Sequence, residues 1–176
     1  MQEKTQEALL ESDSVFKQLL ESSNDAVVTM DEDGFLASWN PGATRMLGWT
    51  AEEAVGKRLS ELMIPPAMRE RHEEGRARVV AGGGPRIMNR QMEMSALRKD
   101  GREIPVELSV WPIKLKKRTL FGAFIRDISK RHFAQAALLN SEQRLRHVID
   151  NVSEGILVVQ DARIVFANPR TEHLVG

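Results

Sequence analysis

The sequence contains no cysteine. This excludes disulfide bonds, cysteine-bound iron–sulfur clusters, thiolate zinc sites and any photochemistry that bonds a chromophore to cysteine sulfur. A net charge is absent as well, because 25 Lys and Arg balance 25 Asp and Glu, so we expect no electrostatic capture of nucleic acid. No apolar run approaches the length of a membrane span, and the polar start lacks the apolar region of a signal peptide. We therefore expect a cytoplasmic protein with no nucleic-acid partner and no membrane partner.

What the sequence does contain is a stretch that nearly recurs. Residues 16–48 are repeated with changes at 145–176, and Asn40-Pro41 of the first copy corresponds to Asn168-Pro169 of the second. The turn of the second copy is one residue shorter. Such self-similarity indicates two copies of one structural unit. Because the first copy continues for about 80 residues more, we expect one complete module, a connector and the opening of a second module.

Hydrophobic periodicity and turn residues predict the secondary structure. Helices are expected at 2–22, from Pro65-Pro66 to about Val80, at 129–151, and in short stretches after Asn40 and Thr50. Strands are expected at 26–30, 35–39, 92–97, 104–111 and 120–126. Thr50, followed by Glu53, predicts a capping box. Asp100-Gly101 predicts a type I′ hairpin turn, and 112–119 a longer basic hairpin loop.

Five antiparallel strands with the helices grouped on one side make an α+β domain. We place an N-terminal helix at 1–15, the complete domain at 16–128, a connector helix at 129–147 and the truncated second copy at 148–176. The connector carries a weak coiled-coil seam at 4-3-4-3 spacing, formed by Ala134, Leu138, Leu145 and Val148 and interrupted by Ser141. The flanking helices, 2–20 and 130–148, are therefore expected to form a parallel homodimer.

Three stretches together resemble the PAS domain, a small sensory module of bacterial signalling proteins: AVVTMDEDGFLASWNPGATRMLGWTAEEAVGK, ALRKDGREIPVELSV and GAFIRDISKR. The resemblance covers about residues 14–129 and restarts at about 145. It implies the PAS fold, in which a five-stranded antiparallel sheet cups a ligand pocket. It also implies dimers built through the flanking helices.

His72 is the strongest candidate for a functional side chain. It lies on the helix after Pro65-Pro66 and precedes Asp100-Gly101 by 28 residues, a spacing that resembles the haem-binding oxygen-sensor branch of PAS domains. A neutral imidazole is a good iron ligand, so the resemblance implies that His72 is the proximal ligand of haem b. It further implies that Arg78 lies near the haem propionates. The apolar walls of the distal side would be Ile87, Leu108 and Val110.

The chain departs from that branch at Met92, where oxygen-binding members hold an arginine. Arg90, two residues earlier, would share a strand face with Met92. Histidine at the position of His72 also occurs in PAS domains that bind no haem. Flavin is a further alternative, since side chains of suitable type are present at Trp39, Asn40 and Trp49. In PAS domains without flavin, however, the tryptophan packs and the asparagine caps the next helix.

Asp127-Ile128-Ser129 resembles the Asp-Ile-Thr motif that joins PAS cores to their output helices. We therefore expect a sensory input module that detects a small ligand, gas or redox state and relays it through a dimeric helix. The full-length protein would be a histidine kinase of a two-component system or a cyclic-di-nucleotide enzyme. No catalytic constellation is evident, so the chain itself is not expected to be an enzyme. The alternative is a ligand-free interaction module whose pocket is filled by its own side chains.

Overall fold

The computed structural model describes residues 2–82, 91–116 and 118–171, with side chains from residue 11 onward. The chain divides into two compact units, one ending at Ser129 and the other beginning at Lys130. The first unit holds a five-stranded sheet and the second a two-stranded sheet. None of the helices in the described ranges is long and apolar enough to cross a membrane.

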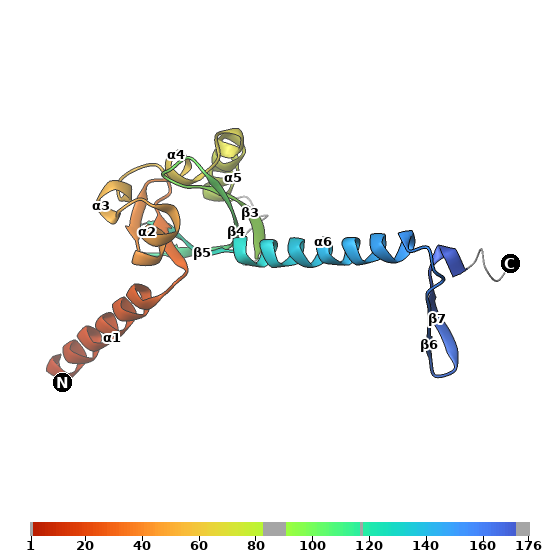
Figure 1. Cartoon of the computed structure of the whole chain (residues 1–176). Coiled ribbons are helices and arrows are strands. Elements are labelled where there is room, and N and C mark those ends of the chain that lie inside the picture. Colours follow the sequence, from red (N-terminus) through yellow and green to blue (C-terminus); the bar gives the residue numbers. More distant parts are fainter. Residues whose placement is uncertain (1, 83–90, 117, 172–176) are drawn as a thin grey trace. The chain divides into compact units, whose positions relative to one another are not determined.

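The five-stranded sheet has the order β2-β1-β5-β4-β3, and every neighbouring pair is antiparallel (Figure 1). Its strands are β1 (Ala26–Met30), β2 (Leu36–Trp39), β3 (Met92–Leu97), β4 (Glu103–Lys114) and β5 (Thr119–Asp127). The sheet and its helices confirm the predicted α+β PAS fold with five antiparallel strands. The hairpin β1–β2 lies beside the last strand, β5, so the two ends of the module meet in the middle of the sheet.

The helices of this unit are α1 (Gln2–Ser22), α2 (Pro41–Leu47), α3 (Ala51–Ala54), α4 (Leu59–Met63), the short 3-10 helix η1 (Pro66–Met68) and α5 (Arg69–Val80). Helices α2, α3 and α4 pack against the sheet, whereas α1 lies mainly against α2 and α5 mainly against α4 and η1. The core forms between α2–α4 and the sheet, with Leu47 from the helices and Val28 and Val106 from the sheet almost completely buried. The opposite face of the sheet carries Trp111 stacked on Phe124, with ring centroids 4.7 Å apart.

Local capping signals were predicted correctly. The Thr50 side chain accepts a hydrogen bond from the Glu53 backbone N–H, and the Glu53 carboxylate accepts one from the Thr50 N–H. Asn40 caps α2 by accepting from the Ala43 N–H. These contacts depend on residues only three apart, so the sequence is sufficient to reveal them.

Two turn predictions were wrong. Gly101 has φ +83, but Asp100 does not lie in the left-handed region, so this hairpin lacks the two consecutive positive φ angles of a type I′ turn. The expected loop at 112–119 is shorter, because β4 extends to Lys114 and the Leu115 N–H donates to the Arg118 carbonyl. Strand pairing with β5 supplies partners for residues 112–114, which local sequence does not disclose.

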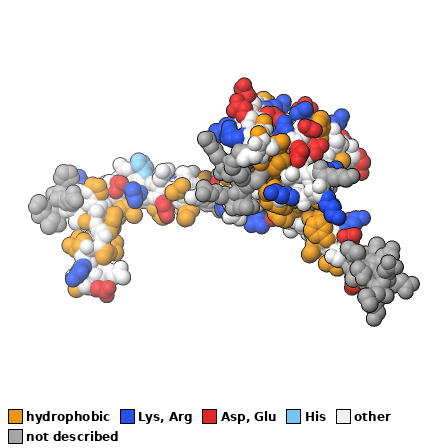
Figure 2. Space-filling model, turned by 180° about the vertical axis from the view of Figure 1, so that it is seen from behind, with side chains coloured by type: hydrophobic (Ala, Val, Ile, Leu, Met, Phe, Trp, Pro, Cys, Tyr) orange, Lys and Arg blue, Asp and Glu red, His pale blue; other side chains and the backbone are white. Residues whose placement is uncertain are grey.

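The second unit contains nearly all of α6 (Ser129–Asn151), together with the hairpin β6 (Leu157–Gln160) and β7 (Arg163–Ala167). No residue of α6 is buried. The predicted seam is highly exposed, with Leu138 and Leu145 each at 61%. Apolar side chains also gather on the hairpin (Figure 2), and six of them are exposed: Leu157, Val158, Val159, Ile164, Val165 and Phe166.

Candidate ligand site

Helix α5 is polar, and none of its residues is buried. Met68, just before the helix, and Val79, near its end, pack against the core of the sheet. His72 follows Met68 by four residues and precedes Val79 by seven, so all three share the inward side of the helix. The predicted iron ligand therefore lies on the side of α5 that faces the core.

The His72 imidazole is mostly enclosed, with a side chain only 23% exposed. Its Nδ1 is buried and has no hydrogen-bond partner among the described residues. The nearest carboxylate oxygen, Glu73 Oε1, is 3.8 Å away, which is too far for a hydrogen bond. A buried polar nitrogen without a partner is costly, so this atom marks a place where a further group would be favourable.

Burial lowers the pKa of His72 below its ordinary value of 6.5. Glu73 opposes this shift, and the positive charge of Arg76 adds to it. The ring is therefore neutral at pH 7, which is the form that coordinates a metal. No group of three or more metal-ligating His, Asp or Glu side chains occurs in the described ranges, but haem iron needs only one protein ligand on its proximal side.

Two arginines hold α5 in place by hydrogen bonds to main-chain carbonyls. Arg69 donates from Nε to the Ile64 carbonyl at 3.1 Å and from Nη2 to the Glu61 carbonyl at 3.0 Å. Arg76 donates from Nη1 to the Glu32 carbonyl, in the turn between β1 and β2. Its Nε and Nη2 also bond to Glu73 Oε2, at 3.0 and 2.7 Å. The helix that carries His72 is thus fastened to α4 at one end and to the first hairpin in its middle.

Arg78, predicted from the sequence to lie near the propionates, is exposed near the end of α5. Arg76, whose side chain is only 16% exposed, was not predicted. A signal was present, because Arg76 follows His72 by four residues and so lies on the same side of the helix. The carbonyl that Arg76 reaches belongs to a turn far away in the sequence, so its bond could not be predicted.

Two of the residues predicted as the apolar wall, Leu108 and Val110, lie on the sheet. Met92 of β3 pairs with Leu108 of β4, on the face that also carries the buried Val106. Leu108 and Val110 are partly buried against the core. Ile87 and Arg90 lie outside the described residues.

The residues considered for flavin are engaged within the protein. Trp39 is buried and donates from Nε1 to the Trp49 carbonyl at 3.1 Å. Asn40 is also buried and makes four hydrogen bonds to main-chain groups. Trp49 packs against the core, and its Nε1 has no partner among the described residues. Trp39 therefore packs in the core, and Asn40 caps the helix that follows it.

Comparison with known families matches residues 15–128 to the PAS fold and residues 143–176 to a second, partial PAS domain. The chain belongs to the PAS family. The PAS domain of an HTR-like protein from Haloarcula marismortui has a TM-score of 0.55 at 24% identity. That alignment covers 72% of this chain and 99% of the other, and it shows a shared fold.

Two curated relatives are sensors by name. The sensor protein FixL of Bradyrhizobium diazoefficiens is 28% identical over 80% of this chain and 28% of its own length. The oxygen sensor protein DosP of Escherichia coli is 24% identical over 94% of this chain and 20% of its own length. The chain thus spans less than a third of either relative, and it is a PAS sensory module related to sensor proteins.

The end of this PAS core is tied to the sheet at Ile128. The Ile128 side chain is buried, and its N–H donates to the Pro105 carbonyl of β4 at 3.1 Å. Asp127 Oδ1 accepts from the Ser129 N–H at 2.7 Å, at the first residue of α6. The Asp-Ile-Ser motif therefore joins the last strand to the connector helix through both backbone and side-chain hydrogen bonds.

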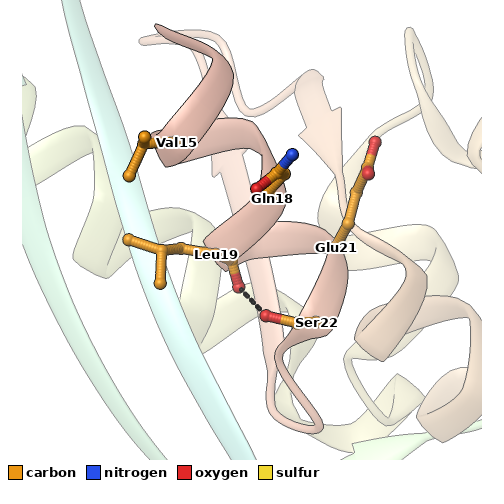
Figure 3. A pocket seen from close by; sticks show the side chains of 5 residues that line it. All are labelled: Val15, Gln18, Leu19, Glu21 and Ser22. Carbon is orange, nitrogen blue, oxygen red and sulfur yellow. Dashed lines mark hydrogen bonds between the residues drawn. The ribbon is translucent and has the colours of Figure 1, made fainter. Parts of the chain in front are cut away.

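Helix α1, at the start of the PAS match, has a shallow hollow on its surface. Val15 and Leu19 project from the same side of the helix, and Ser22 Oγ donates to the Leu19 carbonyl (Figure 3). The hollow is lined by side chains of α1 alone. Two apolar and three polar side chains line it, and it is an open helix surface rather than an enclosed ligand site.

Proposed function

We propose that this PAS chain is the sensory input part of a larger signalling protein, and that its first module senses a small ligand or gas through haem b held by His72. The observation that carries this proposal is the buried, unpartnered Nδ1 of His72 on the inward side of a polar helix. Its neutral imidazole suits iron ligation, because burial lowers the His72 pKa.

Further features support the same assignment. The spacing of His72 before Asp100-Gly101 resembles that of haem-binding PAS domains, and one relative is named an oxygen sensor. Met92, Leu108 and Val110 would supply the apolar wall, and Arg78 a charge for the propionates. Bound haem supplies an iron coordination position for a diatomic gas. The protein's own part is to hold the imidazole neutral and exclude water with apolar side chains.

The test of the haem site is an absorption spectrum of the full chain expressed with haem supply. We expect a Soret band that His72→Ala abolishes, with far-UV circular dichroism nearly unchanged because Ala favours helix. The exposed His132 on α6 offers a matched control, and His132→Ala should keep the band. A band that survives His72→Ala unchanged contradicts the assignment.

A ligand-free interaction module is the second candidate. It is favoured by the partly buried Leu108 and Val110, which already pack against the core. In that case the parent chain would be colourless and would take up no haem on titration. A flavin-like spectrum would contradict both candidates.

The signal would leave through a homodimer formed by α1 and α6. Both helices expose apolar residues, including Phe16 at 63% and Leu145 at 61%, and a lone amphipathic helix is marginal in water without a partner. Two such helices in a dimer can change crossing or register, which would carry a small change in the sheet to a distant output. The output would be a histidine kinase or a cyclic-di-nucleotide enzyme.

Light scattering tests the dimer. Leu138→Lys together with Leu145→Lys should give a monomer or a markedly weaker dimer, because like charges would line the seam. Asn140→Lys together with His147→Lys introduces the same charges with the same spacing on the opposite side of α6 and should leave the dimer intact. An unchanged dimer in the Leu pair would mean that other surfaces form the interface.

A further inference from the structure

The two copies of the repeat contain one buried asparagine each, Asn40 and Asn168, and the two side chains make equivalent hydrogen bonds. Asn40 Oδ1 accepts from the Val27 N–H and the Ala43 N–H, both at 2.8 Å. Asn168 Oδ1 accepts from the corresponding Ile156 N–H at 2.8 Å and the Thr171 N–H at 3.1 Å. In each copy this oxygen connects the start of the first hairpin to the start of the helix that follows it.

The amide nitrogens turn the other way, toward the helix that enters each copy. Asn40 Nδ2 donates to the Leu20 carbonyl at 3.0 Å and to the Asp25 carbonyl at 3.1 Å. Asn168 Nδ2 donates to Ile149 and Glu154 carbonyls, both at 3.0 Å. Leu20 lies two residues before the end of α1, and Ile149 lies two residues before the end of α6. The orientation of both amides is fixed by this pattern, because a flipped amide would set donors against donors.

We infer that Asn40 and Asn168 are positioning residues that couple each entering helix to the sheet of its module. A helix cap requires only the oxygen. The two N–H donors are used instead on the last turn of the preceding helix and on the link that follows it. One planar amide therefore joins three segments, so a shift of the helix end is carried directly to the first strand.

This coupling deepens the helical relay proposed above and rests on it for its use in signalling. The connector α6 would then be fixed at both ends, by Asp127 and Ser129 at its start and by Asn168 at its end. Movement of the first sheet would reach the second hairpin through these two joints. The hydrogen bonds themselves need no ligand, so they can be tested without haem.

Asn→Asp separates the two roles of the amide. A carboxylate still accepts from both backbone N–H groups and remains a good helix cap, but it cannot donate to the carbonyls of the entering helix. Asn→Ser provides a second variant that caps α2 but is too short to reach both carbonyls.

Two exposed asparagines supply matched controls, Asn24→Asp for the first copy and Asn151→Asp for the second. Among the residues that the structure describes, the Asn151 side chain bonds only within α6, to His147.

Spin-label distances measure the coupling directly, and the absence of cysteine means that no background site must be removed. Equivalent label pairs are Lys17→Cys with Ala37→Cys, and Arg146→Cys with Val165→Cys. We expect at least a twofold broadening of the distance distribution in Asn40→Asp and Asn168→Asp, and in the Ser variants. The control variants should match the parent, and helix content by circular dichroism should stay unchanged.

Unchanged widths in the Asp and Ser variants would overturn the inference, because the asparagines would then be caps and nothing more. Broadening accompanied by loss of helix content would also overturn it, since the effect would be structural collapse. Failure to bind haem would not change these spin-label distances. The haem proposal and the asparagine coupling can therefore fail independently.

Discussion

The first hairpins of the two copies have the same local geometry and opposite environments. The register of β1–β2 is repeated in β6–β7, and both hairpins have an irregularity at the equivalent step, Thr29/Met30 and Val158/Val159. Yet β1 is almost wholly buried, whereas every residue of β6 is exposed. The pairing of the hairpin strands is therefore set by local sequence, whereas their burial depends on strands from distant parts of the chain.

The turns of the two hairpins differ because the second is one residue shorter. In the first, Gly34 takes φ +88 and the Asp31 carboxylate accepts from the Asp33 and Phe35 N–H groups. In the second, Asp161 and Ala162 both have positive φ, as a two-residue type I′ turn requires. A left-handed Ala is unfavourable, so strand pairing here overrides a residue preference.

The largest expected difference between the copies is in cooperative stability. Residues 1–129, produced alone, should unfold in one sharp thermal transition followed by circular dichroism. Residues 130–176 should lose their signal gradually, because a bare hairpin and an exposed helix bury too little apolar surface. A sharp transition of the shorter segment, at concentrations where it is monomeric, would contradict this contrast.

Gly42 is expected to be the most sensitive single position of the first copy. A Cβ there would lie 2.2 Å from the Asp25 carbonyl oxygen and 2.9 Å from that of Ser23, and both belong to backbone. Gly42→Ala should lower the free energy of unfolding of residues 1–129 by about 3 kcal/mol or more, measured by urea denaturation.

Two further variants serve as controls for Gly42→Ala. Gly75→Ala in α5 adds a methyl group to open space and should raise stability by about 0.5–1 kcal/mol. Arg170, which occupies the equivalent position of the second copy, is exposed and lies outside residues 1–129, so in the full chain Arg170→Ala should leave the urea transition of the first unit unchanged. Equal losses for Gly42→Ala and Gly75→Ala would mean that the contact with Asp25 is not a constraint.

Gly122 lies on β5, which has no counterpart in the second hairpin. A substitution there tests the packing of β5 against β4. A Cβ on this β5 residue would lie 2.7 Å from two ring atoms of Trp111 on β4. Gly122→Ala should lower the free energy of unfolding by about 1–2 kcal/mol, because Trp111 must leave its stacked position. The penalty should largely disappear in a Trp111→Val background, and a penalty that persists would show that the ring is not its cause.

The smallest expected effect is a dependence of stability on pH in the first unit. Burial lowers the folded-state pKa of His72 below 6.5, so the unfolded chain binds more protons in mild acid. The free energy of unfolding should therefore decrease as pH falls through about 6.5, until the lower folded-state pKa is reached. His72→Gln should flatten this slope in urea titrations between about pH 5 and pH 7.5. Identical slopes in parent and variant would mean that the ring is well solvated.

Much of the fold could be predicted because its signals are local. Short apolar segments bounded by turn residues located all five strands, and the Thr50 capping box was found from residues three apart. The candidate site was predicted less completely. His72, Met92, Leu108 and Val110 were chosen by resemblance, and the structure places the sheet residues on the core face and His72 on the inward side of α5. Arg76 was missed because its bond crosses from α5 to a distant turn.

The repeat, the helix start after Asn40 and the absence of thiol chemistry follow from the sequence, since these depend on residue identity and short-range spacing. Tertiary structure alone decided the rest. Asn40 reaches the end of α1, Arg76 reaches the first hairpin, and His72 retains a nitrogen without a partner among the described residues. The physical reason is distance along the chain: such contacts exist only after strands and helices have docked, and docking is fixed by the whole core.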